Sequence, residues 1–231
     1  ELIVENNAGI RKLSGTVLKN DKTGAVIYTP PDDRDAINNL LKNLEHYINE
    51  DADTAHVLIK MALIHYQFES IHPFYDGNGR TGRIVNVLYL ILAGLLELPI
   101  LYISSYIIQN KATYYKLLQE VRTKNNWEAW ILFMLDCIEH TAKDTLQRIK
   151  HIKTIFDTAA EKVKKELPKI YTRELIEVIF HQPYCKINHL VENNIVERQA
   201  AGRYLKQLED IKVLHSKKVG RDIIYINTEL Y

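Results

Sequence analysis

The sequence has few cysteines and almost no net charge. Its 231 residues include two cysteines, Cys137 and Cys185, which lie far apart and lack the spacing of metal ligands. A reduced intracellular compartment is the simpler interpretation, so we expect a cytoplasmic protein. The formal net charge of +1 gives no whole-chain argument for binding nucleic acid or an anionic membrane surface.

Long hydrophobic runs are also missing. The N-terminal residues "ELIVENNAGI" have no basic segment followed by an apolar core, so they do not predict a signal peptide, and the absence of Met leaves room for upstream residues. The most apolar stretch is 84–103, and its uninterrupted core, Val87 to Leu96, is half of the ~20 residues that a membrane span needs. We expect no membrane contact and a helix buried on all sides at the centre of a domain.

The first part of the chain predicts a mainly α domain with one hairpin. Two β-prone runs, Thr16–Leu18 and Ala25–Tyr28, flank the turn-forming "NDKTG". Asp32 or Asp33 can then cap a helix with apolar residues at helical spacing. Further amphipathic helices are predicted over 54–70, 106–121 and 127–149. This domain is expected to cover residues 1–146.

The remainder predicts a connecting helix and a second, smaller domain. Residues 147–168 are rich in Lys, Glu and Asp with sparse apolar positions, as in a solvated helix that ends at Pro168. Residues 169–231 predict three helices and a hairpin that turns around Val219–Asp222. That order resembles a winged helix-turn-helix module.

One segment, "SIHPFYDGNGRTGR" at 70–83, combines residues that suit phosphate chemistry. A glycine-rich turn that opens onto a helix N-terminus presents backbone N–H groups to an anion. Gly77 and Gly79 allow close approach. Arg80 and Arg83 lie three residues apart on the first turn of the helix, and two guanidinium groups suit a polyphosphate.

The same segment offers a base and a hard oxygen ligand. Asp76 is the kind of ligand that Mg²⁺ takes from a protein when it bridges phosphates. His72 has an ordinary pKa near neutrality and can act as a general base. Together these residues indicate phosphoryl or nucleotidyl transfer to a hydroxyl group.

Other interpretations exist for the same residues. A Gly-Asn-Gly sequence alone is usually only a turn, and a single His before Pro is usually a capped helix end. His65, Glu69 and His72 follow one another at i, i+4 and i+7, which is a metal-ligand spacing on a helix. However, Pro73 biases His72 away from helical geometry, and His65 and Glu69 are explained as a polar helix edge packed against the core.

The segment also resembles a known family. "HPFYDGNGRTGR" is similar, without departure, to the signature of the Fic proteins, His-Pro-Phe-x-Asp/Glu-Gly-Asn-Gly-Arg-x-x-Arg. Similarity to bacterial members extends over "TGAVIYTPP", "HYQFESIHPF", "LPILYISSYIIQNKATYYKLLQEVR" and "WEAWILFML", from about Ala8 to about Leu146. The chain after Pro168 resembles the winged-helix extension of some members. The resemblance implies a Fic-type helical bundle with a β-hairpin flap.

The resemblance implies transfer of AMP from ATP to a Ser, Thr or Tyr hydroxyl of a target protein, and of the enzyme itself. Its residue roles carry over where the motif matches. His72 would deprotonate the hydroxyl, and Asp76 would hold Mg²⁺ against the α- and β-phosphates. Phe74 would anchor the loop in the core. The nucleotide phosphates would be held by the turn and the two arginines: Gly77, Asn78, Gly79, Arg80 and Arg83.

The resemblance also assigns roles outside the motif. The hairpin corresponds to the family's flap, in which Ala25, Val26 and Ile27 would align a target segment by main-chain pairing. Tyr114 and Tyr115 match tyrosines near the nucleotide, with a buried-core position as the alternative for one of them. No segment fits the family's inhibitory pattern Ser/Thr-x-x-x-Glu-Gly/Asn, since Glu5-Asn6 follows Glu1 and Glu192-Asn193 follows Asn188.

A different class of function is carried as an alternative: a nucleotide-responsive DNA-binding regulator. The third helix of the second domain and its hairpin carry basic residues, which are Arg198, Arg203, Lys206, Lys217, Lys218 and Arg221. A helix with a basic wing can bind duplex DNA. Acidic neighbours dilute the charge, however, and the alternative is a protein-binding or packing module whose basic residues are only solvated. His72 and Asp76 argue for the enzyme, since ligand binding alone needs neither. A homodimer is a further hypothesis.

Overall fold

The computed structural model describes residues 9–12, 15–19, 24–50, 54–220 and 222–230. The chain forms two compact units, Glu1–Thr145 and Leu146–Tyr231, with the division inside one long helix. The predicted fold class is confirmed: the described residues are mostly helical, with two small antiparallel sheets. None of the described helices is both long and apolar enough to cross a membrane.

Unit 1 begins with the predicted hairpin. Strand β1 (Leu18–Lys19) pairs antiparallel with β2 (Val26–Tyr28), with Leu18 opposite Tyr28. Helix α1 (Arg34–Asn49) follows, and the Asp33 carboxylate accepts a hydrogen bond from the Ala36 N–H at 2.7 Å. This is the N-cap that the sequence predicted at Asp32 or Asp33.

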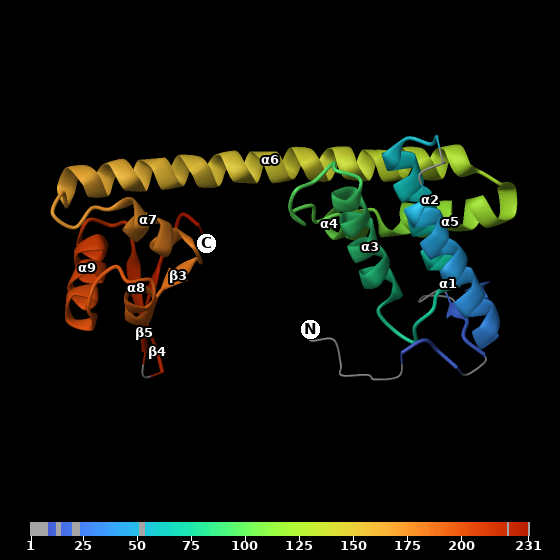
Figure 1. Cartoon of the computed structure of the whole chain (residues 1–231), viewed down its shortest axis with the longest axis horizontal. Coiled ribbons are helices and arrows are strands. Elements are labelled where there is room, and N and C mark those ends of the chain that lie inside the picture. Colours follow the sequence, from blue (N-terminus) through green and yellow to red (C-terminus); the bar gives the residue numbers. More distant parts are fainter. Residues whose placement is uncertain (1–8, 13–14, 20–23, 51–53, 221, 231) are drawn as a thin grey trace. The chain divides into compact units, whose positions relative to one another are not determined.

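Five further helices complete unit 1 (Figure 1). They are α2 (Val57–Ile71), α3 (Asn78–Leu92), α4 (Ser104–Gln109), α5 (Lys111–Lys124) and the start of α6 (Trp127–Glu166). Helix α2 packs against both α1 and α3. Trp130 is fully buried, and its indole N–H donates to the Ala62 carbonyl at 2.9 Å, which ties α6 to α2. The core therefore holds α2 in place, and the loop that follows α2 starts from a fixed point.

The helix expected to be buried on all sides differs from that expectation. Helix α3 ends at Leu92, and Gly94 has a φ of 73°, a left-handed conformation that ends the helix. Ile84, Leu88 and Leu92 are each more than half exposed. They recur every four residues and so form one face. An apolar run predicts helix well, but its burial depends on neighbours that the run does not encode.

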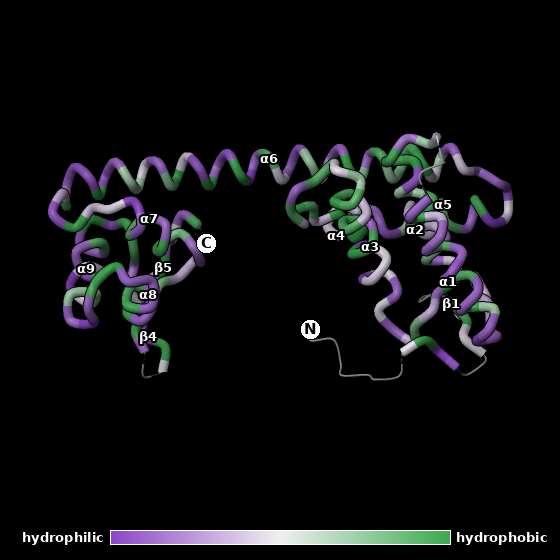
Figure 2. The backbone as a smooth tube through the Cα atoms, viewed as in Figure 1, coloured by the Kyte–Doolittle hydropathy of each residue, from purple (hydrophilic) through white to green (hydrophobic). Residues whose placement is uncertain are grey.

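Unit 2 contains the rest of α6, three short helices and a sheet. The helices are α7 (Arg173–Phe180), α8 (Ile187–Glu192) and α9 (Arg198–Asp210). The strands β3 (Tyr184–Cys185), β4 (His215–Val219) and β5 (Asp222–Ile226) form an antiparallel sheet in the order β3-β5-β4. Figure 2 shows hydrophobic and hydrophilic residues alternating along α6, and Val163 of that helix is fully buried in the core of unit 2.

Candidate active site

His72 lies immediately after α2 in a left-handed conformation. Its φ is 50° and its ψ is 58°, and its N–H donates to the Phe68 carbonyl at 3.0 Å. Proline at the next position disfavours a right-handed helical conformation here. The chain therefore leaves the helix at His72, as Pro73 predicted, and the helical spacing from His65 and Glu69 does not continue to this residue.

A buried arginine far away in the sequence holds the backbone at His72. Arg11 is 1% exposed, and its Nε donates to the His72 carbonyl at 2.8 Å. The Arg11 backbone N–H donates to the Pro73 carbonyl at 2.9 Å, and its side chain also donates to the Pro31 carbonyl. The buried Arg11 thus links the segment before the hairpin to the loop and holds the loop backbone in place.

The electrostatic surroundings of His72 favour a neutral imidazole. Burial lowers its pKa most, and the positive charge of Arg11 lowers the pKa further. The nearby Glu69 backbone raises the pKa and partly offsets these effects. A neutral imidazole at physiological pH can accept a proton, which is what a general base requires.

The Asn78 side chain closes the loop. Its Oδ1 accepts from the Phe74 N–H and its Nδ2 donates to the Phe74 carbonyl, both at 2.8 Å. Asn78 is 3% exposed, and Phe74 packs against the core. The residue before it, Gly77, has a φ of 83° and is the N-cap of α3. The turn thus presents the first N–H groups of α3, which have no partner inside the helix, in an arrangement that can bind an anion.

Asp76 and Arg80 form the outer rim of this turn. Asp76 accepts from the Gly77 N–H at 2.6 Å and from Nη2 of Arg80 at 3.0 Å. Their side chains are 87% and 47% exposed, respectively. Such an exposed pair rearranges at little cost, so both groups are accessible to a ligand.

Arg83 takes a different path from Arg80. Its Nε donates to the Ser104 hydroxyl at 2.7 Å. A methyl group placed on Gly79 would lie 3.0 Å from Nη1 of Arg83, so the guanidinium group lies against the first turn of α3. The two arginines thus flank the turn while holding different partners, Asp76 and Ser104.

Two buried ionisable side chains of α2, His65 and Glu69, contact the start of α3 from the core, and we call them the wall. Nε2 of His65 and the Tyr114 hydroxyl are 2.9 Å apart and joined by a hydrogen bond. Burial lowers the pKa of His65 to about 4 and raises that of Glu69 to about 7. The nearby charge of Arg83 opposes the change at Glu69 without reversing it.

The two tyrosines have different positions. Tyr114 is 3% exposed, and its ring packs against Trp130 and Phe133 in the core. Tyr115 is 48% exposed, and the Lys111 ammonium lies 5.8 Å from the centre of its ring. Of the two, Tyr115 therefore presents more surface to a ligand.

The hairpin is anchored next to the end of α2. The Tyr28 hydroxyl donates to the Ser70 carbonyl at 2.8 Å, and the Arg122 guanidinium stacks on the Tyr28 ring at 3.7 Å. Arg122 also donates to the Ser70 hydroxyl at 3.2 Å. Val26 is 56% exposed, Ala25 is exposed and Ile27 is partly exposed. In the described residues the sheet has two strands, so β2 is an edge strand beside the loop.

Among the described residues, no three His, Cys, Asp or Glu side chains are grouped closely enough to hold a metal ion by themselves. His65 is hydrogen bonded to Tyr114, and His72 has left the helix, so the metal-ligand spacing does not produce a cluster. Asp76 still fits Mg²⁺ in another way. Mg²⁺ usually binds one or two carboxylates, with the remaining ligands from water and substrate phosphates, and the Asp76 carboxylate is exposed beside the anion site.

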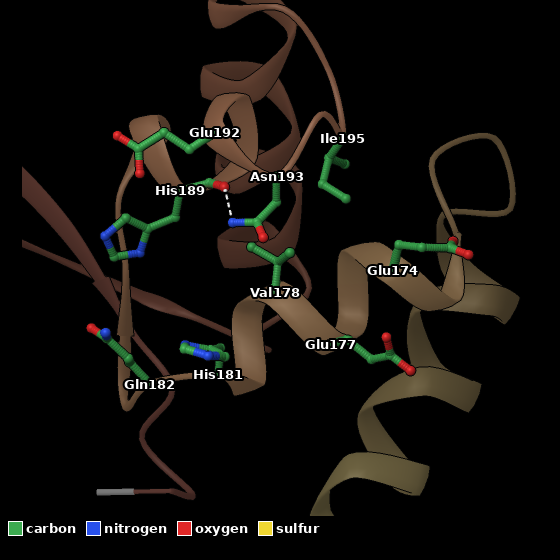
Figure 3. Close-up of a pocket in the computed structure, with 9 residues that line it drawn as sticks. All are labelled: Glu174, Glu177, Val178, His181, Gln182, His189, Glu192, Asn193 and Ile195. Atoms are coloured by element: carbon green, nitrogen blue, oxygen red, sulfur yellow. Dashed lines mark hydrogen bonds between the residues drawn. The ribbon is translucent and has the colours of Figure 1, made fainter.

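Unit 2 contains a groove of about 520 Å³ between α7 and α8 (Figure 3). Glu177 in this groove accepts from Arg173 at 2.9 Å, and the Asn193 amide donates to the His189 carbonyl at 2.8 Å. Its nine lining residues include three glutamates and two histidines: Glu174, Glu177, Val178, His181, Gln182, His189, Glu192, Asn193 and Ile195. These residues do not reproduce the base, turn and arginine pair of unit 1, so the candidate active site is in unit 1.

Three contributors to the site were not predicted as such from the sequence: Arg11, Glu69 and Arg122. Arg11 contacts the loop and Arg122 contacts the end of α2, each over about 50 to 60 residues of chain, and no local pattern marks such contacts. Glu69 gives a weak signal, since it is an acid in a mostly apolar helix that packs on both sides.

Two regions of the chain are similar to known protein families. Residues 4–90 match the model of the Fic/DOC family, and residues 155–230 match that of the C-terminal domain of SoFic-like protein adenylyltransferases. The "Protein adenylyltransferase Fic" of Drosophila grimshawi is 34% identical over 103 residues, which are 44% of this chain and 20% of the relative. The protein of the same description from Drosophila melanogaster gives the same values. The chain thus spans about a fifth of these relatives.

A solved structure supports the fold. The crystal structure of a Fic family protein from Desulfovibrio desulfuricans G20 aligns with a TM-score of 0.56 and 19% identity. The alignment covers 97% of this chain and 64% of that one. At this identity the likeness concerns the fold alone.

Proposed function

The chain carries a Fic/DOC family domain and a SoFic-like C-terminal domain, and on this basis we propose that it is a protein adenylyltransferase. The enzyme would transfer AMP from ATP to a Ser, Thr or Tyr hydroxyl of a target protein, and to itself. One observation carries the proposal: a partly buried imidazole with a lowered pKa lies next to an anion-binding turn flanked by two arginines.

In this proposal His72 is the general base. Its neutral imidazole accepts the proton of the target hydroxyl while the hydroxyl oxygen attacks the α-phosphorus of ATP. The bond from the α-phosphorus to the bridging oxygen breaks, and pyrophosphate leaves. Because Arg11 and the Phe68 carbonyl hold the backbone on both sides of His72, the imidazole is positioned before the substrates bind.

The turn and the two arginines bind the phosphates. We assign the backbone N–H groups of Gly77, Asn78 and Gly79 to the anion site, with the Asn78 side chain maintaining its shape. Arg80 and Arg83 grip the β- and γ-phosphates from two sides of the turn. The charge that develops on the departing pyrophosphate is stabilised by these preorganised donors.

Asp76 would hold Mg²⁺. When bound, the ion would neutralise phosphate charge and polarise the phosphoryl oxygens. Arg80 now shares the Asp76 carboxylate, so we expect this arginine to turn from Asp76 to the nucleotide phosphates when ATP binds.

The hairpin and Tyr115 complete the proposed substrate site. Main-chain pairing along β2, at Ala25, Val26 and Ile27, would align the target segment without reading its sequence. We assign Tyr115, rather than the buried Tyr114, to a direct contact with the nucleotide. Tyr114 would act from the core through His65.

For unit 2 we propose a winged helix-turn-helix module, supported by three helices followed by the β4–β5 hairpin. The domain limits remain those expected from the sequence: 1–146, 147–168 and 169–231. The match over residues 155–230 is to a domain of SoFic-like protein adenylyltransferases, and neither family match favours the DNA-binding alternative. A cytoplasmic location and a homodimer stay hypotheses.

The test uses ATP labelled on the α-phosphate and, in parallel, on the γ-phosphate, each incubated with the protein, Mg²⁺ and a cell lysate. Lysate kinases transfer the γ-phosphate by themselves, so each labelling is compared with the same lysate without this protein. We expect additional protein bands that carry the α-label only. Additional γ-labelled bands would indicate phosphate transfer instead, and no additional band with either label would contradict a transferase.

A further inference from the structure

Glu69 lies directly beneath the anion-binding turn. A methyl group placed on Gly82 would be 3.0 Å from Oε1 of Glu69, and one placed on Gly79 would be 3.6 Å from the same atom. The carboxyl group therefore contacts the first turn of α3 from the core side. Glu69 is 8% exposed, and its Oε1 makes no hydrogen bond within the described part of the chain.

The charged and titratable groups around Glu69 come from three helices. Arg83 approaches from α3 and Arg122 from α5, and both favour the ionised carboxylate. Tyr114 on α5 and His65 on α2 are neutral neighbours, because burial raises the pKa of Tyr114 well above its usual value and lowers that of His65 to about 4. His72, which follows on the same segment, has a lowered pKa.

Arg83 lies close to both Glu69 and the turn: its charge acts on the Glu69 carboxyl group, and among the described residues the two side chains form no hydrogen bond or ion pair. Its Nη1 would be 3.0 Å from a methyl group on Gly79, the glycine that Glu69 also approaches. A polyphosphate on this turn would bring several negative charges close to both side chains. An ionised Glu69 would repel that ligand and would compete with it for Arg83.

We propose that Glu69 is a positioning residue for Arg83: its carboxyl group takes up a proton from solvent when a polyphosphate binds, so that no negative charge in the core attracts the guanidinium away from the ligand. The proton adds to the carboxylate and no other bond changes. When the ligand leaves, the carboxylic acid returns this proton to solvent and becomes a carboxylate again. This inference rests on the proposed function, since it takes the turn to be the site of the ATP phosphates.

Burial and the charge of Arg83 have opposite effects on the pKa of Glu69, and the resulting value lies close to physiological pH, so proton uptake costs little free energy. Burial raises the pKa of Glu69 to about 7, against the opposing effect of the two arginines. A ligand's negative charge raises the pKa of a nearby carboxyl group further. By linkage, ATP then binds less tightly as the pH rises above the pKa of the free protein, by at most about tenfold per pH unit.

The experiment measures proton uptake on ATP binding to the full chain with Mg²⁺. Calorimetric titrations are run at about pH 7.5 in buffers with different ionisation enthalpies, and the dependence of the heat on the buffer gives the protons bound. The variants are Glu69→Gln, which keeps the shape without the titration, and Glu45→Gln, an exposed glutamate of α1 as the matched control. His72→Gln tests whether the other nearby titratable group is responsible.

We expect the wild type, Glu45→Gln and His72→Gln to take up a similar fraction of a proton, about half or more, and Glu69→Gln to take up much less. The affinity of Glu69→Gln should also lose its pH dependence between about pH 7 and pH 8.5. Equal uptake in the wild type and Glu69→Gln, or an uptake lost only in His72→Gln, would overturn the proposal.

A measurement on the wild type alone covers the case in which Glu69→Gln does not fold. Infrared difference spectra on adding ATP should show a protonated carboxyl band, and its absence would count against the proposal. The proposed function is tested separately. A protein that binds ATP with proton uptake but transfers no AMP refutes the transferase and not the linkage. A protein that transfers AMP without uptake at Glu69 refutes only the linkage.

Discussion

The solvent-facing side and the core-facing side of the first turn of α3 differ in exposure and in electrostatic environment. On the outer rim, Asp76 and Arg80 are exposed and bonded to each other. On the inner wall, His65 and Glu69 are buried and have pKa values far from the usual ones. The exposed pair of the rim can change partners at little cost when a ligand binds, whereas the groups of the wall are enclosed in the core and respond to a ligand through their charge.

The largest effect is expected at the residue between these two sides. His72→Ala should lower the rate of AMP transfer by ~10²–10⁴-fold, because a general base contributes about that much. ATP affinity should change little, since His72 is assigned no phosphate contact. Transfer assays with α-labelled ATP and calorimetric titrations check both points. Near-normal transfer by the variant would mean that another group is the base.

The second largest effect is expected for Arg83→Ala, because Arg83 lies against the turn and its charge also acts on Glu69 of the wall. Loss of a charge-assisted hydrogen bond costs ~1.5–3 kcal/mol, so ATP affinity should fall by roughly one to two decades. ADP should lose less if Arg83 holds the γ-phosphate. Titration of both nucleotides decides this. Equal losses of affinity for ATP and ADP would show that Arg83 does not hold the γ-phosphate, and no loss for either would show that it does not contact the nucleotide.

On the wall, Glu69→Gln should stabilise the protein at high pH. The folded-state pKa of about 7 lies above the ordinary 4.5, so the protonated form favours folding. That stability is present below about pH 4.5 and is lost as the pH rises to about 7. Urea unfolding should show the variant to be ~1–3 kcal/mol more stable than the wild type at about pH 8. An equal loss of stability in the variant as the pH rises would remove Glu69 as the cause.

On the rim, the smallest effect is expected. Asp76→Asn keeps an acceptor for the Gly77 N–H and removes the charge that pairs with Arg80. Exposed ion pairs contribute about 0–1 kcal/mol, so the free energy of unfolding should change by less than ~1 kcal/mol. A larger change in urea unfolding would show that Asp76 has a structural role in addition to its proposed metal contact.

The sequence predicted the rim better than the wall. Gly77, Asp76, Arg80 and His72 lie within a few residues of one another, so a local motif is enough to relate them to phosphate chemistry. Glu69 acquires its properties from Arg83 and Arg122 on other helices, and Arg11 reaches His72 from the start of the chain. Such contacts exist only after packing, and a single sequence holds no direct record of them.

The fold shows the same limit. The hairpin and the cap at Asp33 follow local rules and were predicted within a few residues. The apolar segment after Arg83 was expected to be buried on all sides, yet α3 ends at Leu92 with one face exposed. Period and capping predict where a helix forms, whereas burial depends on which helices pack against it.

The central claim is that this site transfers AMP to a hydroxyl group. The most direct measurement is mass spectrometry of a protein modified in lysate or of the enzyme itself, with fragmentation to locate the adduct. We predict AMP attached to a Ser, Thr or Tyr side chain with wild-type protein and no adduct with His72→Ala. A phosphate adduct, or AMP formed equally by both proteins, would contradict the account.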